Sequence, residues 1–225
     1  MAPPPGDPGK GPDVFTGIVE EVGTLRTLRV GEKSAALEVA ASIVTHELAV
    51  GDSVLTDGVC LTVTAVRPAG FTADVMPETV RRTTLADRRP GDRLNLERAL
   101  TLRSRLGGHL VSGHIDGVGT VASMKPEDNA LVVTFEAPAA VADVSVAQGS
   151  VAVDGVSLTI VAVEGRRLTV SLIPHTASVT TLSRLAPGVR VNLEADLIAK
   201  YVYAFVHGRK PADGLTWEKL AESGF

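Results

Sequence analysis

Cys60 and Ser157 occupy matching places in two nearly identical segments of this sequence. The first segment reads DGVCLT from Asp57, and the second reads DGVSLT from Asp154. An unperturbed thiol has a pKa of about 8.5, whereas a serine hydroxyl stays protonated across the physiological range, so the two side chains are different proton partners. Two further matched pairs also differ in proton affinity: Ile18 against His114, and Glu78 against His175. The pattern predicts two similar pockets that take different roles in a proton-transfer reaction.

These pairs belong to an internal repeat. Ser53 returns as Ser150, and the same offset of 97 residues holds from there to the end of the second copy. Only the front motif departs, because the TGI from Thr16 returns as the SGH from Ser112, 96 residues later. A register this long predicts two homologous domains. The expected organisation is a tail at 1–13, domains at 14–105 and 106–196, and a helix with a tail at 197–225.

Each copy is rich in short β-strand patterns separated by turn residues. Val, Thr and Ile recur in alternating or wholly apolar runs, and the Asp-Gly pairs tolerate the positive φ angles of a tight hairpin. About six short strands per copy predict an all-β fold of two tandem six-stranded Greek-key β-barrels, with a sandwich as the alternative. Residues 77–85 are predicted as a short helix that closes one end of the first barrel. In the first copy, strands are predicted at 37–40, 53–56, 60–66 and 71–75.

Residues 197–206 are predicted as a C-terminal helix, because their apolar positions recur at helical spacing and form one stripe. This stripe either packs on its own barrel or mediates self-association. A helix that follows two complete barrels has little of its own domain left to cover.

The charge and composition exclude several classes of protein. A net charge of −4 provides no basic field for phosphates, so no nucleic-acid partner is expected. No apolar run approaches the roughly 18 residues of a membrane span, so no membrane association is expected. A single cysteine cannot form an internal disulfide, which is typical of a reducing compartment, and we expect a cytoplasmic protein.

Six motifs in order resemble riboflavin synthases of the alpha-chain type, a family of lumazine-binding double barrels. The motifs begin at Phe15 (FTGIVE), Gly58 (GVCLTV), Gly107 (GGHLVSGH), Asp154 (DGVSLT), Leu172 (LIPHT) and Asn192 (NLE, with DLIAKY following). The resemblance implies transfer of a four-carbon unit between two molecules of 6,7-dimethyl-8-ribityllumazine, giving riboflavin and 5-amino-6-(D-ribitylamino)uracil with no external cofactor. It also implies a homotrimer with an intersubunit active site, and it leaves an association with lumazine synthase open.

The same resemblance places substrate contacts in both barrels. Those in the first barrel are Gly17, Ile18, Val19, Cys60, Leu61, Thr62, Asp74, Val75, Met76, Pro77, Glu78 and Thr79. Those in the second are Gly113, His114, Ile115, Gln148, Ser157, Leu158, Thr159, Ser171, Leu172, Ile173, Pro174, His175 and Thr176. The catalytic candidates are Ser53, Cys60 and His109 in the first-barrel site, with Asp154 and Ser157 supplied from a second barrel.

Each candidate also has a purely structural interpretation. An isolated cysteine in an apolar strand is usually an inert core residue. Asp154 stands at a turn, where aspartate often does no more than shape the backbone. His109 and His114 lack the i, i+4 spacing of a helical metal pair, so no metal site is predicted.

Three positions depart from the family pattern. Gln148 stands where the family has a lysine close to ligand on the neighbouring subunit, and Asp57 stands where it has asparagine. Val14 stands where the family begins with Met, after thirteen residues rich in Pro and Gly. Residues 1–13 are therefore expected to be a disordered tail or a start-site artefact, with translation beginning at Val14 through a GTG codon.

The rival class is a binding module. Lumazine proteins are non-catalytic relatives that hold one lumazine or flavin, and their second barrel tends to lose ligand residues. Here the second copy keeps the segments 157–159 and 173–176, which favours the enzyme.

Overall fold

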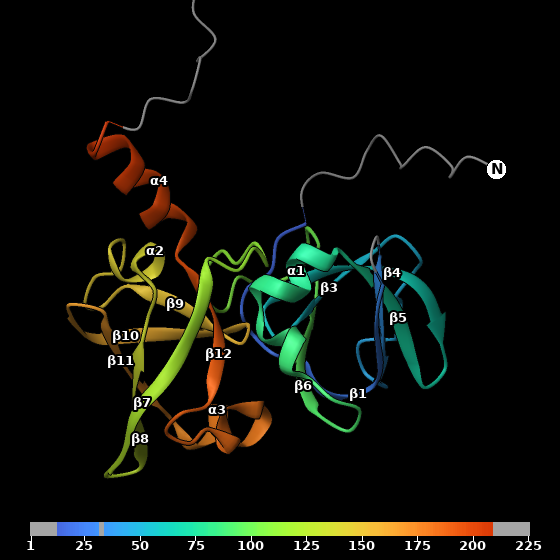
Figure 1. The fold of residues 1–225 in the computed structure, drawn as a ribbon, viewed down its shortest axis with the longest axis horizontal. Coiled ribbons are helices and arrows are strands. Elements are labelled where there is room, and N and C mark those ends of the chain that lie inside the picture. The colour runs from blue at the N-terminus through green and yellow to red at the C-terminus, as the bar shows by residue number, and fades with distance from the viewer. Residues whose placement is uncertain (1–12, 32–33, 209–225) are drawn as a thin grey trace, which may run out of the picture.

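The computed structural model describes residues 13–31 and 34–208, which form two closed six-stranded antiparallel β-barrels in tandem (Figure 1). The first barrel contains β1 (Glu21–Val30), β2 (Ala35–Ala40), β3 (Ser53–Thr56), β4 (Val59–Arg67), β5 (Gly70–Val75) and β6 (Arg93–Arg98). The second contains β7 (Gly117–Glu127), β8 (Ala130–Glu136), β9 (Ser150–Val153), β10 (Val156–Glu164), β11 (Arg167–Leu172) and β12 (Arg190–Ala195). The first ring runs β1-β2-β5-β4-β3-β6, and the second repeats this order. The closed rings confirm the predicted barrels over the sandwich.

Alternation along the strands separates the cores from the outer surface. In β4, Leu61 and Val63 are buried in the first core, whereas Thr62 and Thr64 face outward. β10 repeats this burial pattern around the second core. Because the side-chain period of a strand is two, the outward threonines lie on one face of each barrel.

Both predicted hairpin turns are confirmed by their backbone angles. Asp57 and Gly58 have φ of 46° and 83°, and Asp154 and Gly155 have φ of 45° and 77°. Positive φ at both central residues matches the right-handed twist of the flanking strands, which is why Asp-Gly serves there.

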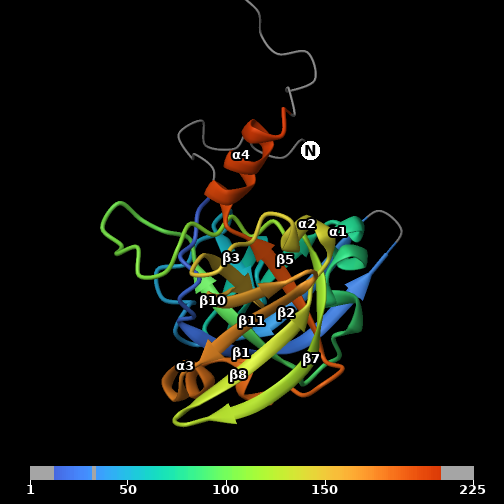
Figure 2. The same cartoon turned by 90° about the vertical axis from the view of Figure 1, so that its left-hand side faces the viewer.

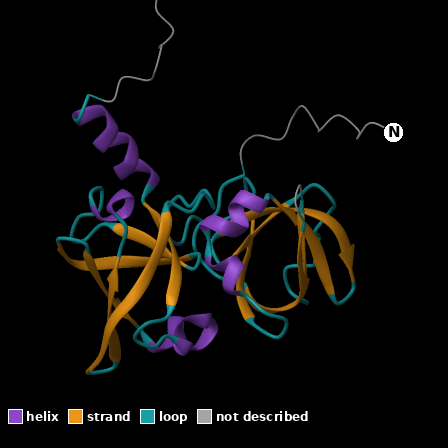
Figure 3. Ribbon diagram, viewed as in Figure 1, coloured by secondary structure: helices purple, strands orange, loops and turns teal. Residues whose placement is uncertain are grey.

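The continuous helix predicted over 77–85 is wrong at Thr83. The chain forms α1 (Pro77–Arg82), an extended residue at Thr83, and a 3₁₀ helix η1 (Thr84–Asp87), shown in purple in Figure 3. Thr83 Oγ1 donates to the Thr79 carbonyl at 2.7 Å and accepts from the Leu85 amide at 3.3 Å, so one hydroxyl ends one helix and starts the next. The second copy repeats this break between α3 (Pro174–Val179) and the 3₁₀ helix η2 (Thr181–Arg184). A further short helix, α2 (Ala139–Ala142), was not predicted from the sequence.

The C-terminal helix α4 (Leu197–Val206) stands away from both barrels, as Figures 1 and 2 show. None of its residues is buried, and Phe205 is 88% exposed. Packing of the apolar stripe on its own barrel, one of the two alternatives, is therefore wrong within this chain. The helix is fixed at its base, where Lys200 pairs with Asp116 of the second domain at 2.9 Å.

Parts of the predicted tails lie outside the described residues, namely 1–12 and 209–225. Within the described part of the chain, no helix is long and apolar enough to cross a membrane.

Candidate active site

The front segment of each domain packs on the hairpin of the other domain. The Cys60 amide in β4 donates to the Gly113 carbonyl at 3.0 Å, and the Ser157 amide in β10 donates to the Gly17 carbonyl at 2.8 Å. The two front segments also pair with each other through a bridge at Phe15, which lies fully buried between the barrels. Two equivalent contacts thus cross between the domains.

Side-chain packing follows the same crossing. Val19 packs against the core of the second barrel, and Ile115 packs against the core of the first. The sequence-based grouping of residues 17–19 with Cys60 is therefore wrong within one chain, where they lie on the Ser157 side. Either arrangement gives each segment similar neighbours, because the two copies are alike.

Glycine is required at both crossing points. Gly17 and Gly113 have φ of +76° and +78°, a region that residues with a Cβ adopt only with strain. A Cβ at position 113 would also lie 2.4 Å from the Cβ of Cys60, and one at position 17 would lie 2.7 Å from the Cβ of Ser157. These glycines bring the front segments into direct backbone contact with the two central positions of the site.

Two buried glutamates hold the front segments in place. Glu97 accepts hydrogen bonds from the Thr16 amide and hydroxyl, both at 2.7 Å, and from the Gly17 amide at 2.9 Å. Glu194 binds Ser112 and Gly113 in the same way. Burial raises the pKa of Glu97 to about 7 and also raises that of Glu194.

Neither glutamate was predicted from the sequence as a functional residue. Their signal was the repeated Asn-Leu-Glu triplet at 95–97 and 192–194.

The first site is an outward polar face beside Cys60. Thr62 is directly opposite Asp74 in the β4–β5 ladder, and both side chains are exposed. Met76, which precedes α1, is 72% exposed, so its side chain is open to a ligand on this face. Leu61 and Val75 are buried in the core, so they can offer a ligand only their backbone groups.

The second site contains a histidine in contact with its central hydroxyl. His109 Nδ1 lies 2.7 Å from Ser157 Oγ, and burial lowers the pKa of the imidazole, which favours the neutral ring. His109 was predicted to act with Cys60, and the structure instead places it beside Ser157 of the same chain. Thr159 and Ile173 are exposed, as are Thr62 and Met76, the equivalent residues of the first site.

Asp154 lies in a polar network between the barrels rather than on either outer face. Its carboxylate is buried and accepts from the Asn192 amide at 2.7 Å, and Arg88 lies 4.0 Å away. The same arginine pairs with Asp57 at 2.6 Å. Burial raises the pKa of Asp57 to about 6 and that of Asp154 well above its usual value. Asn95 completes the crossing by donating to the Asp154 carbonyl at 2.9 Å.

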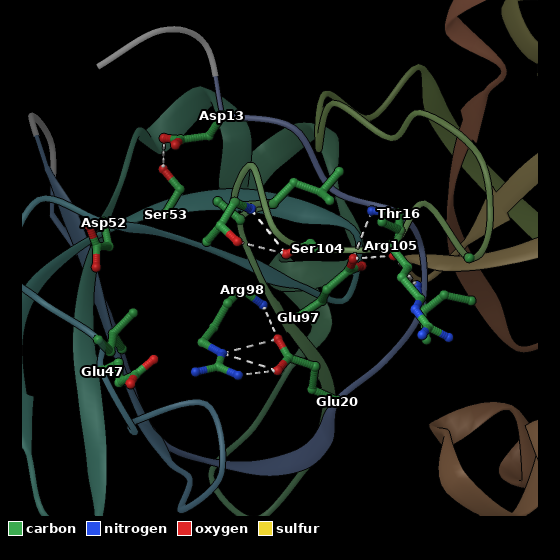
Figure 4. A pocket seen from close by; sticks show the side chains of 16 residues that line it. Asp13, Thr16, Glu20, Glu47, Asp52, Ser53, Glu97, Arg98, Ser104 and Arg105 are labelled. Atoms are coloured by element: carbon green, nitrogen blue, oxygen red, sulfur yellow. Dashed lines mark hydrogen bonds and ion pairs between the residues drawn. The ribbon is translucent and has the colours of Figure 1, made fainter. Parts of the chain in front are cut away.

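Ser53 lines a separate cavity of about 590 Å³ between the first barrel and the segment that joins the domains (Figure 4). Its hydroxyl donates to Asp13 at 2.6 Å. Cys60, Ser157 and His109 do not line this cavity. The structure therefore separates the catalytic candidates into four neighbourhoods within one chain: Cys60, His109 with Ser157, Asp154, and Ser53.

Two predicted substrate contacts, Gln148 and Glu78, are exposed. Gln148 has φ of +66°, and its backbone amide donates to the Ile160 carbonyl at 2.8 Å. The residue therefore lies in a turn with left-handed backbone. Glu78 is engaged by Arg81 at 2.7 Å within α1. Among residues 13–31 and 34–208, no group of three or more His, Cys, Asp or Glu side chains is arranged to hold a metal ion.

Comparison with known proteins identifies the same domain twice in this chain. The model of the lumazine binding domain family matches residues 16–99 and 112–196, one match for each barrel. Riboflavin synthase from Bacillus subtilis (strain 168) is 41% identical over 215 residues, which cover 94% of this chain and 100% of the relative. Riboflavin synthase from Mycobacterium bovis (strain ATCC BAA-935 / AF2122/97) is 48% identical over 193 residues, covering 84% and 96%.

Solved structures share the fold. The crystal structure of LumP complexed with 6,7-dimethyl-8-(1'-D-ribityl) lumazine aligns with a TM-score of 0.72 at 23% identity, covering 80% of this chain and 98% of LumP. LumP complexed with flavin mononucleotide aligns with a TM-score of 0.71 at 22% identity and the same coverage. At this identity the likeness speaks to the double-barrel architecture alone.

Proposed function

Because the chain belongs to the lumazine binding domain family, we propose that it acts as a riboflavin synthase. This transferase moves a four-carbon unit between two molecules of 6,7-dimethyl-8-ribityllumazine, giving riboflavin and 5-amino-6-(D-ribitylamino)uracil. The observation that carries the proposal is the pair of matched outer faces, one around Cys60 and one around Ser157, each completed by a front segment of the other domain. Similar pockets select similar ligands, and a reaction between two identical molecules needs two of them.

The two sites differ in the groups that can hold or move a proton. The first site offers the Cys60 thiol and the exposed His114, whereas the second offers the Ser157 hydroxyl held by a neutral His109. We assign Cys60 to proton transfer and His109 to positioning Ser157. The main contribution of the two sites is to orient the two substrate rings, since holding reactants in the right geometry can lower the activation barrier by roughly 7–11 kcal/mol.

Helix α4 supports a homotrimer in which a first-barrel site of one subunit faces a second-barrel site of another. Its exposed apolar residues form a stripe that residues 13–31 and 34–208 leave uncovered: Ile198, Tyr201, Val202, Phe205 and Val206. An apolar surface of this kind on a soluble domain marks an association site. Sedimentation at assay concentration tests the trimer, and an active monomer would refute both the association and the intersubunit site.

Incubation with 6,7-dimethyl-8-ribityllumazine tests the activity directly. Riboflavin fluorescence should appear, with one riboflavin formed for every two lumazines consumed. Cys60→Ala should lower kcat at least tenfold and Cys60→Ser less, whereas Thr64→Ala, an exposed change on the same strand, should leave turnover unchanged. Tight binding without product would instead indicate a lumazine or flavin carrier.

A further inference from the structure

A small cavity between the two barrels is lined by arginines from both. It measures about 180 Å³, and Arg88 and Arg93 of the first domain face Arg184 and Arg190 of the second. Its acidic lining residue is Asp92. This volume is below the roughly 300–1,000 Å³ of pockets that enclose drug-sized ligands, so the cavity is small for a ribityllumazine. The cavity is distinct from the outer faces proposed for the substrate.

The repeat explains why the arginines are poorly balanced. Arg190 of the second domain pairs with Asp87 of the first at 2.6 Å. With the repeat offset of 97 residues, the equivalent positions are Arg93 and Arg184. One side of the domain contact therefore has the Asp87–Arg190 ion pair, whereas the equivalent positions on the other side are both arginine. Like charges at such a contact repel one another unless an anion lies between them.

The arginines on this side have no carboxylate partner within the described part of the chain. Arg93 donates to the neutral Val22 carbonyl at 2.8 Å, and Arg184 has no hydrogen bond or ion pair to another described residue. The oxygen of Asp92 accepts instead from the Arg89 amide at 2.8 Å.

Arg88 contributes a further unmet donor. Its Nη2 is engaged by Asp57, but its Nε is buried and has no acceptor among residues 13–31 and 34–208. A buried N–H without an acceptor costs about 1–3 kcal/mol, so this donor favours the binding of an acceptor in the cavity.

We propose that this cavity binds a phosphate-sized oxyanion, which bridges Arg93 of the first barrel and Arg184 of the second. Guanidinium groups recognise phosphate oxygens through paired N–H donors, and a tetrahedral anion can accept from several arginines at once. The anion replaces, on this side of the contact, the carboxylate that Asp87 supplies on the other. It fastens the domains together and takes no part in the proposed synthase reaction.

The test is a titration of the full chain with inorganic phosphate at constant ionic strength, followed by calorimetry and by the thermal unfolding midpoint. Phosphate should bind saturably and raise the midpoint, since a ligand specific for the folded state stabilises it by mass action. Chloride should not. Phenyl phosphate, which carries the same group on a larger body, should bind at least tenfold more weakly if the cavity takes free phosphate, and equally well if it takes phosphate esters.

Arg184→Asp is the decisive variant, because it builds the counterpart of the Asp87–Arg190 pair. It should weaken phosphate binding at least tenfold while keeping or raising the midpoint without phosphate. Arg184→Gln should also lose the phosphate response, without that rescue. Arg29→Asp, an equal charge change at an exposed site on β1, should respond as the parent chain does. Absence of saturable phosphate binding, or an unchanged response in Arg184→Asp, would overturn the proposal, and neither outcome bears on riboflavin formation.

Discussion

Replacing Gly113 with alanine is expected to destabilise the chain by about 3–6 kcal/mol. The left-handed backbone at φ +78° costs a residue with a Cβ about 1–2 kcal/mol. The new Cβ would lie 2.4 Å from the Cβ of Cys60 and 2.8 Å from its amide nitrogen, so backbone must shift, and overpacking of this kind costs about 1–3 kcal/mol. The shift also weakens the hydrogen bond from the Cys60 amide, worth about 1 kcal/mol.

Gly188→Ala separates the strain from the clash. Gly188 has φ of +89°, and a Cβ there would meet no atom within 4 Å. This control should lose only the backbone strain, about 1–2 kcal/mol. Urea unfolding followed by circular dichroism measures both variants.

Turnover should separate the two variants further. Gly113→Ala displaces the segment that completes the Cys60 site, so kcat/KM for riboflavin formation should fall at least tenfold, whereas Gly188→Ala should keep the parent value. If Gly113→Ala were no more damaging than Gly188→Ala in stability and activity, the crossing of the front segments would be refuted.

Three further predictions concern the domain contact and α4. At pH 7, Arg88→Gln should cost about 3–5 kcal/mol, because it leaves the buried Asp57 carboxylate without its partner at 2.6 Å, whereas Arg89→Gln, at an exposed neighbouring position, should cost less than about 0.5 kcal/mol; equal urea midpoints for the two variants would contradict this. Since the pKa of Asp57 is raised from 3.8 to about 6 on folding, its contribution to stability is present below pH 3.8 and is lost as the pH rises through 6. Denaturation curves across this window should show that fall in the parent chain, and a fall equally steep in Asp57→Asn would refute its origin. If the proposed trimer forms through α4, Phe205→Asp should turn it into monomers in sedimentation and abolish turnover, with unchanged circular dichroism as the control for folding.

The repeat made the barrels predictable, whereas it left the crossing invisible. Alternation and the Asp-Gly turns predicted strands that the structure contains, and helical spacing predicted the bounds of α4. The placement of Gly17 on Ser157 rather than on Cys60 was hidden, because two like domains offer nearly the same surface to either segment. His109 followed that crossing to the second barrel. The break at Thr83 was hidden for another reason, since it depends on the hydrogen bonds of one hydroxyl.

The function was more predictable than the positions of individual catalytic groups. Motif order and the two copies pointed to a reaction between identical molecules. Ser53 and Asp154 were chosen by position within motifs, which says nothing of how deeply a side chain is buried or which neighbour engages it. The catalytic role of each stays a prediction, and Asp154 lies buried in the domain contact, where its carboxylate accepts from the Asn192 backbone amide.

The crossed front segments give the two barrels of one chain the arrangement of a segment-exchanged dimer. Two identical single barrels that exchanged such segments would form a self-complementary pair around a two-fold axis. In that pair every substitution appears twice, so neither site could change alone. A single chain that carries both copies is free of this constraint, and its two copies differ at matched positions: cysteine against serine at 60 and 157, arginine against leucine at 88 and 185, and aspartate against arginine at 87 and 184. Because both barrels lie in one chain, each site can change without the other, and the two sites can take different roles.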